Sequence, residues 1–177
     1  MNTYIALLRA IGGKYTLPSK TFVELLESLG LKDAKTYIAT GNAAFRSRSA
    51  NTVALAQKIK AAIEANRGFA PETLILTPDE MAAAIADNPY RKAEAAPASL
   101  HVTFLSAVPQ APDLAKLESL LANGEQFMLN DRVFYFHAPE GVGRSKAFAR
   151  AEKSLGVWGT ARNWRSTVNI KALADTL

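Results

Sequence analysis

Hydrophobic positions in the first half of the chain switch between two spacings. Short apolar runs bounded by glycine or polar residues predict strands over residues 3–9, 35–40, 43–47 and 73–76. Apolar residues three and four positions apart predict helices that begin near Pro18, Asn51 and Pro78. The third start is the clearest, because Thr77 and Glu80 have the spacing of a capping box around a proline at the first helical position. The first six elements have the order of a ferredoxin-like unit, strand-helix-strand-strand-helix-strand.

The same pattern begins again after residues 91–98, an alanine-rich stretch broken by Pro97 that we interpret as a linker. Strands are predicted over residues 100–104, 127–129 and 133–136, and helices over 114–121, 145–155 and from about Asn163 onward. The second half therefore has the order strand-helix-strand-strand-helix-helix, in which a helix replaces the last strand. We expect an α+β protein with two ferredoxin-like subdomains packed together, one over residues 1–92 and one over residues 97–177.

The composition is that of a globular protein, since 49% of the 177 residues are hydrophobic. Lys and Arg number 21 against 16 Asp and Glu, and this net charge of +5 is spread along the chain, which fits a phosphate-bearing partner but gives no basic tail for nucleic acid. The absence of cysteine excludes disulfides, thiolate catalysis and Cys-ligated metals. No apolar run approaches the roughly 20 residues that span a bilayer. The N-terminus also lacks the features of a signal peptide, so we expect a cytoplasmic protein without membrane association.

A first candidate site is the glycine-containing turn over residues 141–146. Its glycines allow backbone N–H groups to form an anion-binding concavity, and Ser145 is placed to cap the following helix. Arg144 and Lys146 lie at the same helix start, where the helix dipole disfavours cations unless an anion is bound. The alternative is an ordinary loop and cap, with both basic side chains solvated.

The segment Arg162–Arg165 is a second candidate site of the same kind. Asn163 is the predicted N-cap of the last helix, and Arg162 and Arg165 lie on either side of it. Trp164 is expected to face the core rather than to stack on a base. The arginines can bind an anion or pair with carboxylates, and the sequence leaves both open. The two segments open successive helices, which favours one shared ligand.

Other motifs carry weaker signals. Gly12–Lys14 lacks the upstream glycine and the following Ser or Thr of a Walker A loop, and Thr40–Asn42 is expected to form a turn. His101 and His137 lie in predicted strands with no carboxylate at a fixed spacing, so they form no metal-binding pattern and are expected to be satisfied or exposed. No two carboxylates stand out as an acid-base pair. We therefore expect neither a metal nor a cofactor.

The chain resembles a bacterial family known only as domain-of-unknown-function family 1697. The resemblance runs nearly end to end and rests on Leu7-Leu8-Arg9, Gly12-Gly13-Lys14, Thr40-Gly41-Asn42, Asn88-Pro89-Tyr90, Gly143-Arg144-Ser145-Lys146 and Arg162-Asn163-Trp164-Arg165. It implies a two-part α+β protein of ferredoxin-like topology. One departure is the loop Ala10-Ile11-Gly12-Gly13, because the family usually has Gly-Ile-Asn-Val-Gly-Gly after the first arginine. The family has no accepted activity, so the resemblance implies no reaction.

These observations lead to one main hypothesis and three alternatives. The main hypothesis is a protein that binds a phosphate-bearing or other anionic, nucleotide-like ligand through Arg144, Ser145, Lys146, Arg162, Asn163 and Arg165. The second is an enzyme acting on such a ligand, with Ser145 or Lys146 nearest the chemistry and His137 as the base. A nucleic-acid-binding module is weaker, because the aromatic signature of RNA-binding sheets is absent. The last is a structural protein with no ligand, in which both motifs brace the fold.

Overall fold

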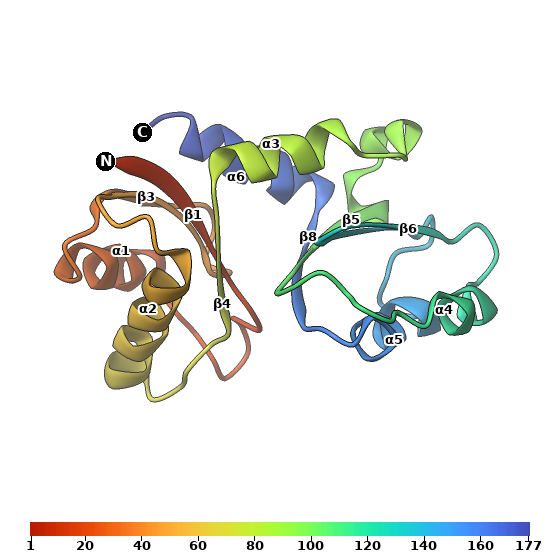
Figure 1. Cartoon of the computed structure of the whole chain (residues 1–177), viewed down its shortest axis with the longest axis horizontal. Coiled ribbons are helices and arrows are strands. Elements are labelled where there is room, and N and C mark those ends of the chain that lie inside the picture. The colour runs from red at the N-terminus through yellow and green to blue at the C-terminus, as the bar shows by residue number, and fades with distance from the viewer. The chain divides into compact units, whose positions relative to one another are not determined.

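Figure 1 shows the computed structural model, which describes all 177 residues of the chain. The contacts between residues divide the chain into two compact units. The first unit comprises Met1–Ala83 and Val168–Leu177, and the second comprises Ala84–Thr167. Each unit holds one four-stranded antiparallel sheet, and the chain has six α-helices in all. The protein is therefore a mixed α+β protein, as the sequence predicts.

The C-terminal residues belong to the first unit, although they follow the whole of the second in sequence. The Asn169 side-chain amide donates a hydrogen bond to the Tyr37 hydroxyl (2.9 Å). The Lys35 ammonium donates to the Thr176 hydroxyl, also at 2.9 Å. The expected subdomain bounds, 1–92 and 97–177, stay a prediction. The contacts between residues assign Val168–Leu177 to the first unit.

The first unit has the predicted order of elements. They are β1 (Asn2–Leu8), α1 (Ser19–Ser28), β2 (Lys32–Thr36), β3 (Asn42–Ser47), α2 (Thr52–Arg67) and β4 (Thr73–Leu76), followed by α3 (Pro78–Ala86). The strand order is β2-β3-β1-β4, and every neighbouring pair is antiparallel. β2 begins at Lys32, earlier than expected. Its register against β3 shifts between Lys32 and Lys35, and this irregularity hides the alternation that would predict a strand there.

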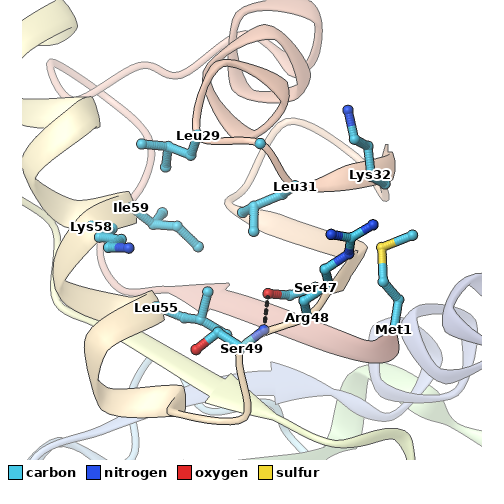
Figure 2. Close-up of a pocket in the computed structure, with 11 residues that line it drawn as sticks. Met1, Leu29, Leu31, Lys32, Ser47, Arg48, Ser49, Leu55, Lys58 and Ile59 are labelled. Atoms are coloured by element: carbon cyan, nitrogen blue, oxygen red, sulfur yellow. Dashed lines mark hydrogen bonds between the residues drawn. The ribbon is translucent and has the colours of Figure 1, made fainter.

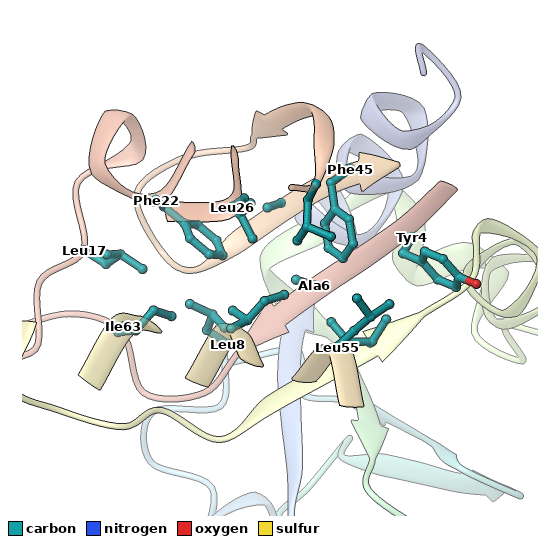
Figure 3. Close-up of a cluster of buried hydrophobic side chains, with 13 residues drawn as sticks. Tyr4, Ala6, Leu8, Leu17, Phe22, Leu26, Phe45, Leu55 and Ile63 are labelled. Atoms are coloured by element: carbon teal, nitrogen blue, oxygen red, sulfur yellow. The ribbon is translucent and has the colours of Figure 1, made fainter. Parts of the chain in front are cut away.

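The central strand β1 is buried on both faces. On one face Tyr4, Ala6 and Leu8 pack against Phe45 of β3 and against apolar side chains of α1 and α2 (Figure 3). The helices contribute Phe22, Leu26, Leu55, Ile59 and Ile63 to this cluster. Ile5, on the other face of β1, is also fully buried. Burial on both faces explains why β1 has a continuous apolar run instead of an alternating one.

Side chains fix the helix starts that the sequence predicts. Asn51 caps α2, because its side-chain oxygen accepts the Ala54 N–H at 2.9 Å. At the start of α3 the Thr77 hydroxyl accepts the Glu80 N–H (3.1 Å) and the Glu80 carboxylate accepts the Thr77 N–H (2.7 Å). These two bonds form the reciprocal capping box and satisfy donors that a helix start otherwise leaves open. Both predicted caps are confirmed.

The second unit begins at Ala84, near the end of α3, and continues with two short 3-10 turns in the segment predicted as a linker. Its elements are η1 (Arg91–Ala95), η2 (Pro97–Ser99), β5 (Leu100–Leu105), α4 (Leu114–Leu120), β6 (Gln126–Asn130), β7 (Val133–His137), α5 (Lys146–Leu155) and β8 (Gly159–Asn163). The last helix, α6 (Trp164–Ala174), begins in the second unit, and its residues from Val168 onward belong to the first. The strand order is β6-β7-β5-β8, again with antiparallel neighbours. Both sheets therefore have the same order of strands relative to their order in the chain.

The expectation that a helix replaces the last strand of the second half is wrong. Residues 159–163 form β8, which pairs with β5 from Gly159 opposite Leu105 to Asn163 opposite His101. The segment has no apolar alternation, so its strand depends on pairing with a distant part of the chain rather than on local pattern. A Cβ atom at Gly159 would lie 2.8 Å from the Thr103 side chain, which shows how closely β8 approaches β5. The last helix follows this strand.

We expect Gly41→Ala to lower the free energy of unfolding more than Gly30→Ala. Both glycines have φ +79°, a backbone conformation that costs other residues about 1–2 kcal/mol. A Cβ atom at Gly41 would also lie 2.6 Å from the Leu8 Cβ and 2.8 Å from the Ile11 side chain, whereas one at Gly30 would meet nothing within 4 Å. Overpacking should add about 1–3 kcal/mol at Gly41 alone. Chemical denaturation of both variants measures the difference, and equal losses would contradict the close approach.

Candidate functional site

The glycine-containing turn before α5 is held by short-range hydrogen bonds. The Gly141 N–H donates to the Ala138 carbonyl at 2.8 Å, and the Ser145 N–H donates to the Val142 carbonyl at 3.1 Å. The Ser145 hydroxyl accepts the Phe148 N–H at 3.1 Å, which confirms Ser145 as the N-cap of α5. Because Ser145 is buried, its role in this turn is to fix the helix start.

Two cations lie at this helix start with no acidic partner. Arg144 and Lys146 are both exposed, and neither forms an ion pair. The backbone N–H groups of Lys146 and Ala147, in the first turn of α5, have no acceptor in the protein. Unpaired N–H groups at a helix start carry partial positive charge, so this end of α5 is electropositive in both backbone and side chains.

The β8–α6 corner has the same local design. The Asn163 side-chain oxygen accepts the Ser166 N–H at 2.9 Å, so Asn163 caps α6 as predicted. The Thr167 hydroxyl donates to the Asn163 carbonyl at 3.0 Å. Trp164 is 7% exposed and belongs to the core, whereas Arg165 is exposed to solvent. Among these residues, Arg165 is the one free to meet a ligand through its side chain.

The sheet brings the two segments to one end of the second unit. β7 and β8 lie on either side of β5 and are both antiparallel to it, so they run in the same direction. β7 ends at His137, opposite Leu100, and β8 ends at Asn163, opposite His101. Since neighbouring strands lie about 4.8 Å apart, the ends of β7 and β8 lie about 10 Å apart.

Aromatic contacts hold the start of α5 against the same end. The Phe148 ring, in the first turn of α5, lies 5.5 Å from the His101 ring and 5.3 Å from the Phe136 ring, measured between centroids. We call the turn over residues 141–146 and the corner over residues 162–165, at the end of the sheet where β5 begins, the basic end. The backbone therefore leads both motifs to the same end of the sheet, and their convergence on one ligand stays a prediction.

The Arg162 side chain points away from α5. Residues 159 and 161 of β8 line a cavity of about 170 Å³ beside α5, so Arg162, between Ala161 and Asn163, extends from the opposite face of the sheet. Its guanidinium donates to the Thr160 hydroxyl (2.7 Å) and to the Ala161 carbonyl (2.8 Å). Burial lowers the pKa of Arg162 to about 10, which leaves it charged at neutral pH. The Arg162 side chain thus lies on the face of the sheet opposite α5.

The two histidines also lie on opposite faces. His137, the expected base, lies on the same face as Tyr135, and its ring is 5.9 Å from that of Tyr90. His101 lies on the α5 face against Phe148, its Nδ1 is buried without a hydrogen-bond partner, and burial lowers its pKa. The Nδ1 of His101 is therefore unsatisfied, and the residue is only partly exposed. The sequence held a signal for this burial. His101 stands between apolar residues of β5, so its side chain lies on the face of the strand opposite to that of Leu100.

The remaining motifs have structural explanations. Gly12 and Tyr15 exchange backbone hydrogen bonds at 2.9 and 3.0 Å, and the Lys14 ammonium lies 4.9 Å from the centre of the Tyr15 ring. The Asn42 side chain donates to the Tyr37 carbonyl and the Thr40 hydroxyl, so the expected turn is confirmed, with Gly41 at positive φ.

No group of three or more His, Asp or Glu side chains is placed to hold a metal ion. None of the helices combines the length and the apolar character needed to cross a bilayer.

The chain belongs to the family described as "Protein of unknown function (DUF1697)", whose model matches residues 1–135. The matched region ends before the turn over residues 141–146. A solved structure with a similar fold is the conserved bacterial protein SP0830 from Streptococcus pneumoniae, with 20% sequence identity and a TM-score of 0.72. The alignment covers 97% of this chain and 98% of that protein. At this identity the likeness shows the fold. No curated protein matches the chain.

The environment of His101 predicts a specific dependence of stability on pH. Because burial holds the pKa of folded His101 below 6.5, the unfolded chain takes up a proton more readily than the folded one. The free energy of unfolding should fall as the pH drops below 6.5 and level off below the pKa of folded His101. His101→Gln should remove this component, as measured by chemical denaturation at a series of pH values.

His137→Gln is the matched control for this experiment, since it removes the other histidine from the opposite face of the sheet. It should leave the component due to His101 in place. An NMR titration that gave His101 a pKa at or above 6.5 would contradict the buried environment described for its ring.

Proposed function

We propose that the protein binds a small phosphate-bearing, nucleotide-like anion at the basic end of the second unit. The observation that carries this proposal is that β7 and β8 end at the same end of the sheet and each leads into the start of a helix, where Arg144, Lys146 and Arg165 are exposed. Arg144 and Lys146 stand where the dipole of α5 disfavours cations. A bound anion would relieve this repulsion and would accept hydrogen bonds from the open N–H groups of α5.

The six residues predicted for this site divide into three roles under the proposal. Arg144, Lys146 and Arg165 contact the ligand through exposed side chains. Ser145 and Asn163 hold the two turns through their capping bonds. Arg162 contributes positive charge from behind the sheet, because its side chain lies on the face opposite α5.

An enzyme acting on the same ligand is a second candidate, and the placement of His101 favours it. His101 lies on the α5 face against Phe148, and its buried Nδ1 has no hydrogen-bond partner in the protein, so this nitrogen is free to accept a proton. In this variant of the proposal His101 takes the role that the sequence assigned to His137. Release of phosphate from model phosphomonoesters, measured in the wild type and in His101→Gln, tests it.

We also propose that each unit is a ferredoxin-like fold. The strand orders β2-β3-β1-β4 and β6-β7-β5-β8 support this assignment. So does the place of the helices, one after the first strand and one after the third strand of each unit. In the second unit these helices are α4 and α5.

Small anions should raise the melting temperature of the wild-type protein if the proposal is correct. Pyrophosphate, ADP and a short oligonucleotide are the probes. A ligand at 100 times its Kd adds about 2.7 kcal/mol to the free energy of unfolding, which corresponds to about 5 °C or more in Tm for a chain of this size. The double variant Arg144→Gln/Lys146→Gln should lose most of the shift.

Arg150→Gln is the matched control, because Arg150 is exposed on α5 one turn beyond Lys146 and is not in an ion pair. It should keep the shift. If the double variant is stabilised as much as the control, or if no anion stabilises the wild type, the proposed site is wrong. A response to the oligonucleotide alone would favour nucleic acid over a small ligand.

A further inference from the structure

A second set of unpaired cations surrounds a cavity in the first unit, far along the chain from the basic end. The cavity has a volume of about 410 Å³, which is within the range of small-molecule sites. It lies where the α1–β2 connection, the end of β3 and the start of α2 meet (Figure 2). Every lining residue belongs to the first unit, so the cavity is complete within it.

The inner wall of the cavity is apolar. Leu31 follows α1, and Leu55 and Ile59 lie one turn apart on α2. All three belong to the hydrophobic core of the first unit and are at most 5% exposed. Their side chains converge on the cavity in Figure 2. An apolar group that entered would therefore meet packed core atoms rather than mobile side chains.

The mouth of the cavity is positively charged. Lys32 and Arg48 lie on one side of it and Lys58 on the other (Figure 2). All three residues are exposed, none is in an ion pair, and no carboxylate lines the cavity. Asp33, next to Lys32 in sequence, is bound instead to Arg46, with 3.5 Å between charged atoms. Three like charges around one opening attract an anion and repel a cation.

The polar wall is held in place before any ligand arrives. The Ser47 hydroxyl accepts the Ser49 N–H at 3.1 Å, a bond drawn in Figure 2, and the Ser49 hydroxyl accepts the Asn51 N–H at 3.2 Å. Asn51 in turn caps α2. This series of bonds ties the loop that carries Arg48 to the helix that carries Lys58. A preformed wall lowers the ordering cost of binding.

We propose that this cavity binds a small amphipathic anion, a single carboxylate or phosphate head joined to a short apolar chain. The head lies between Arg48, Lys32 and Lys58, and the apolar part lies against Leu31, Leu55 and Ile59. Carboxylate and phosphate heads share the chemistry that the cations recognise, so both are tested. This site is separate in sequence and in residues from the basic end, and it does not depend on the function proposed there.

Titration of the wild-type protein with sodium octanoate and octyl phosphate, followed by calorimetry and by amide NMR shifts, tests this proposal. Both probes should bind at least tenfold more tightly than acetate or inorganic phosphate, because only they fill the apolar part. Octanol and octylamine should bind at least tenfold more weakly than octanoate, because they lack the negative head. The largest shifts should fall on the amides of residues 47–51 and 55–59.

The variant Arg48→Gln/Lys58→Gln should weaken octanoate binding at least tenfold. Lys20→Gln/Lys92→Gln removes the same charge at exposed positions outside the cavity and should leave the affinity within twofold. Arg144→Gln/Lys146→Gln should also leave it unchanged, which separates this outcome from that of the basic end. Equal binding of octanol and octanoate, or no effect of Arg48→Gln/Lys58→Gln, overturns the proposal. Binding to anionic lipid vesicles without binding of free octanoate also overturns it and assigns the cations to a membrane surface.

Discussion

Antiparallel pairing of β5 with a strand on each side determines where the candidate ligand-binding residues of the second unit lie. Because β7 and β8 both run opposite to β5, they must end at the same edge, and whatever follows each of them starts there. One strand is followed by the turn that carries Arg144 and the other by the corner that carries Arg165. Side-chain direction obeys the same pairing. The pleat that places Ala161 beside α5 places Arg162 on the other face.

The elements that the sequence predicted best are those with local start signals. Asn51 caps one helix and the Thr77–Glu80 pair caps another. In each case the hydrogen bonds join residues three positions apart, so a short window of sequence is enough to predict them. β8 was missed because residues 159–163 become a strand only through pairing with β5, about sixty residues earlier. β1, by contrast, could be predicted from its own residues. A strand that is buried on both faces needs apolar residues at successive positions, and the continuous apolar run of β1 shows this.

The capping residues of the two basic turns could be predicted from the sequence, but the faces of the sheet on which nearby side chains lie could not. The capping roles of Ser145 and Asn163 follow from residue type, and both are present. The face on which Arg162 and His137 lie depends on register, which the sequence of the missed strand could not supply. The cavity beside Arg48 has no local signature, because it joins residues from a loop, a strand end and a helix. The net charge of +5 alone does not say which cations are available to a ligand. The structure does, because Asp33, Glu72 and Asp175 form ion pairs with cations elsewhere and leave those around the cavity without a partner.

The membership of residues 168–177 in the first unit orders the events of folding during synthesis. The ribosome makes the whole of Ala84–Thr167 before it makes Asn169. The hydrogen bond between Tyr37 and Asn169 can therefore form only after the second unit has been translated. Domains generally fold as their residues emerge. Here the unit that starts first is completed last, because Val168–Leu177 are translated only after the whole of the second unit.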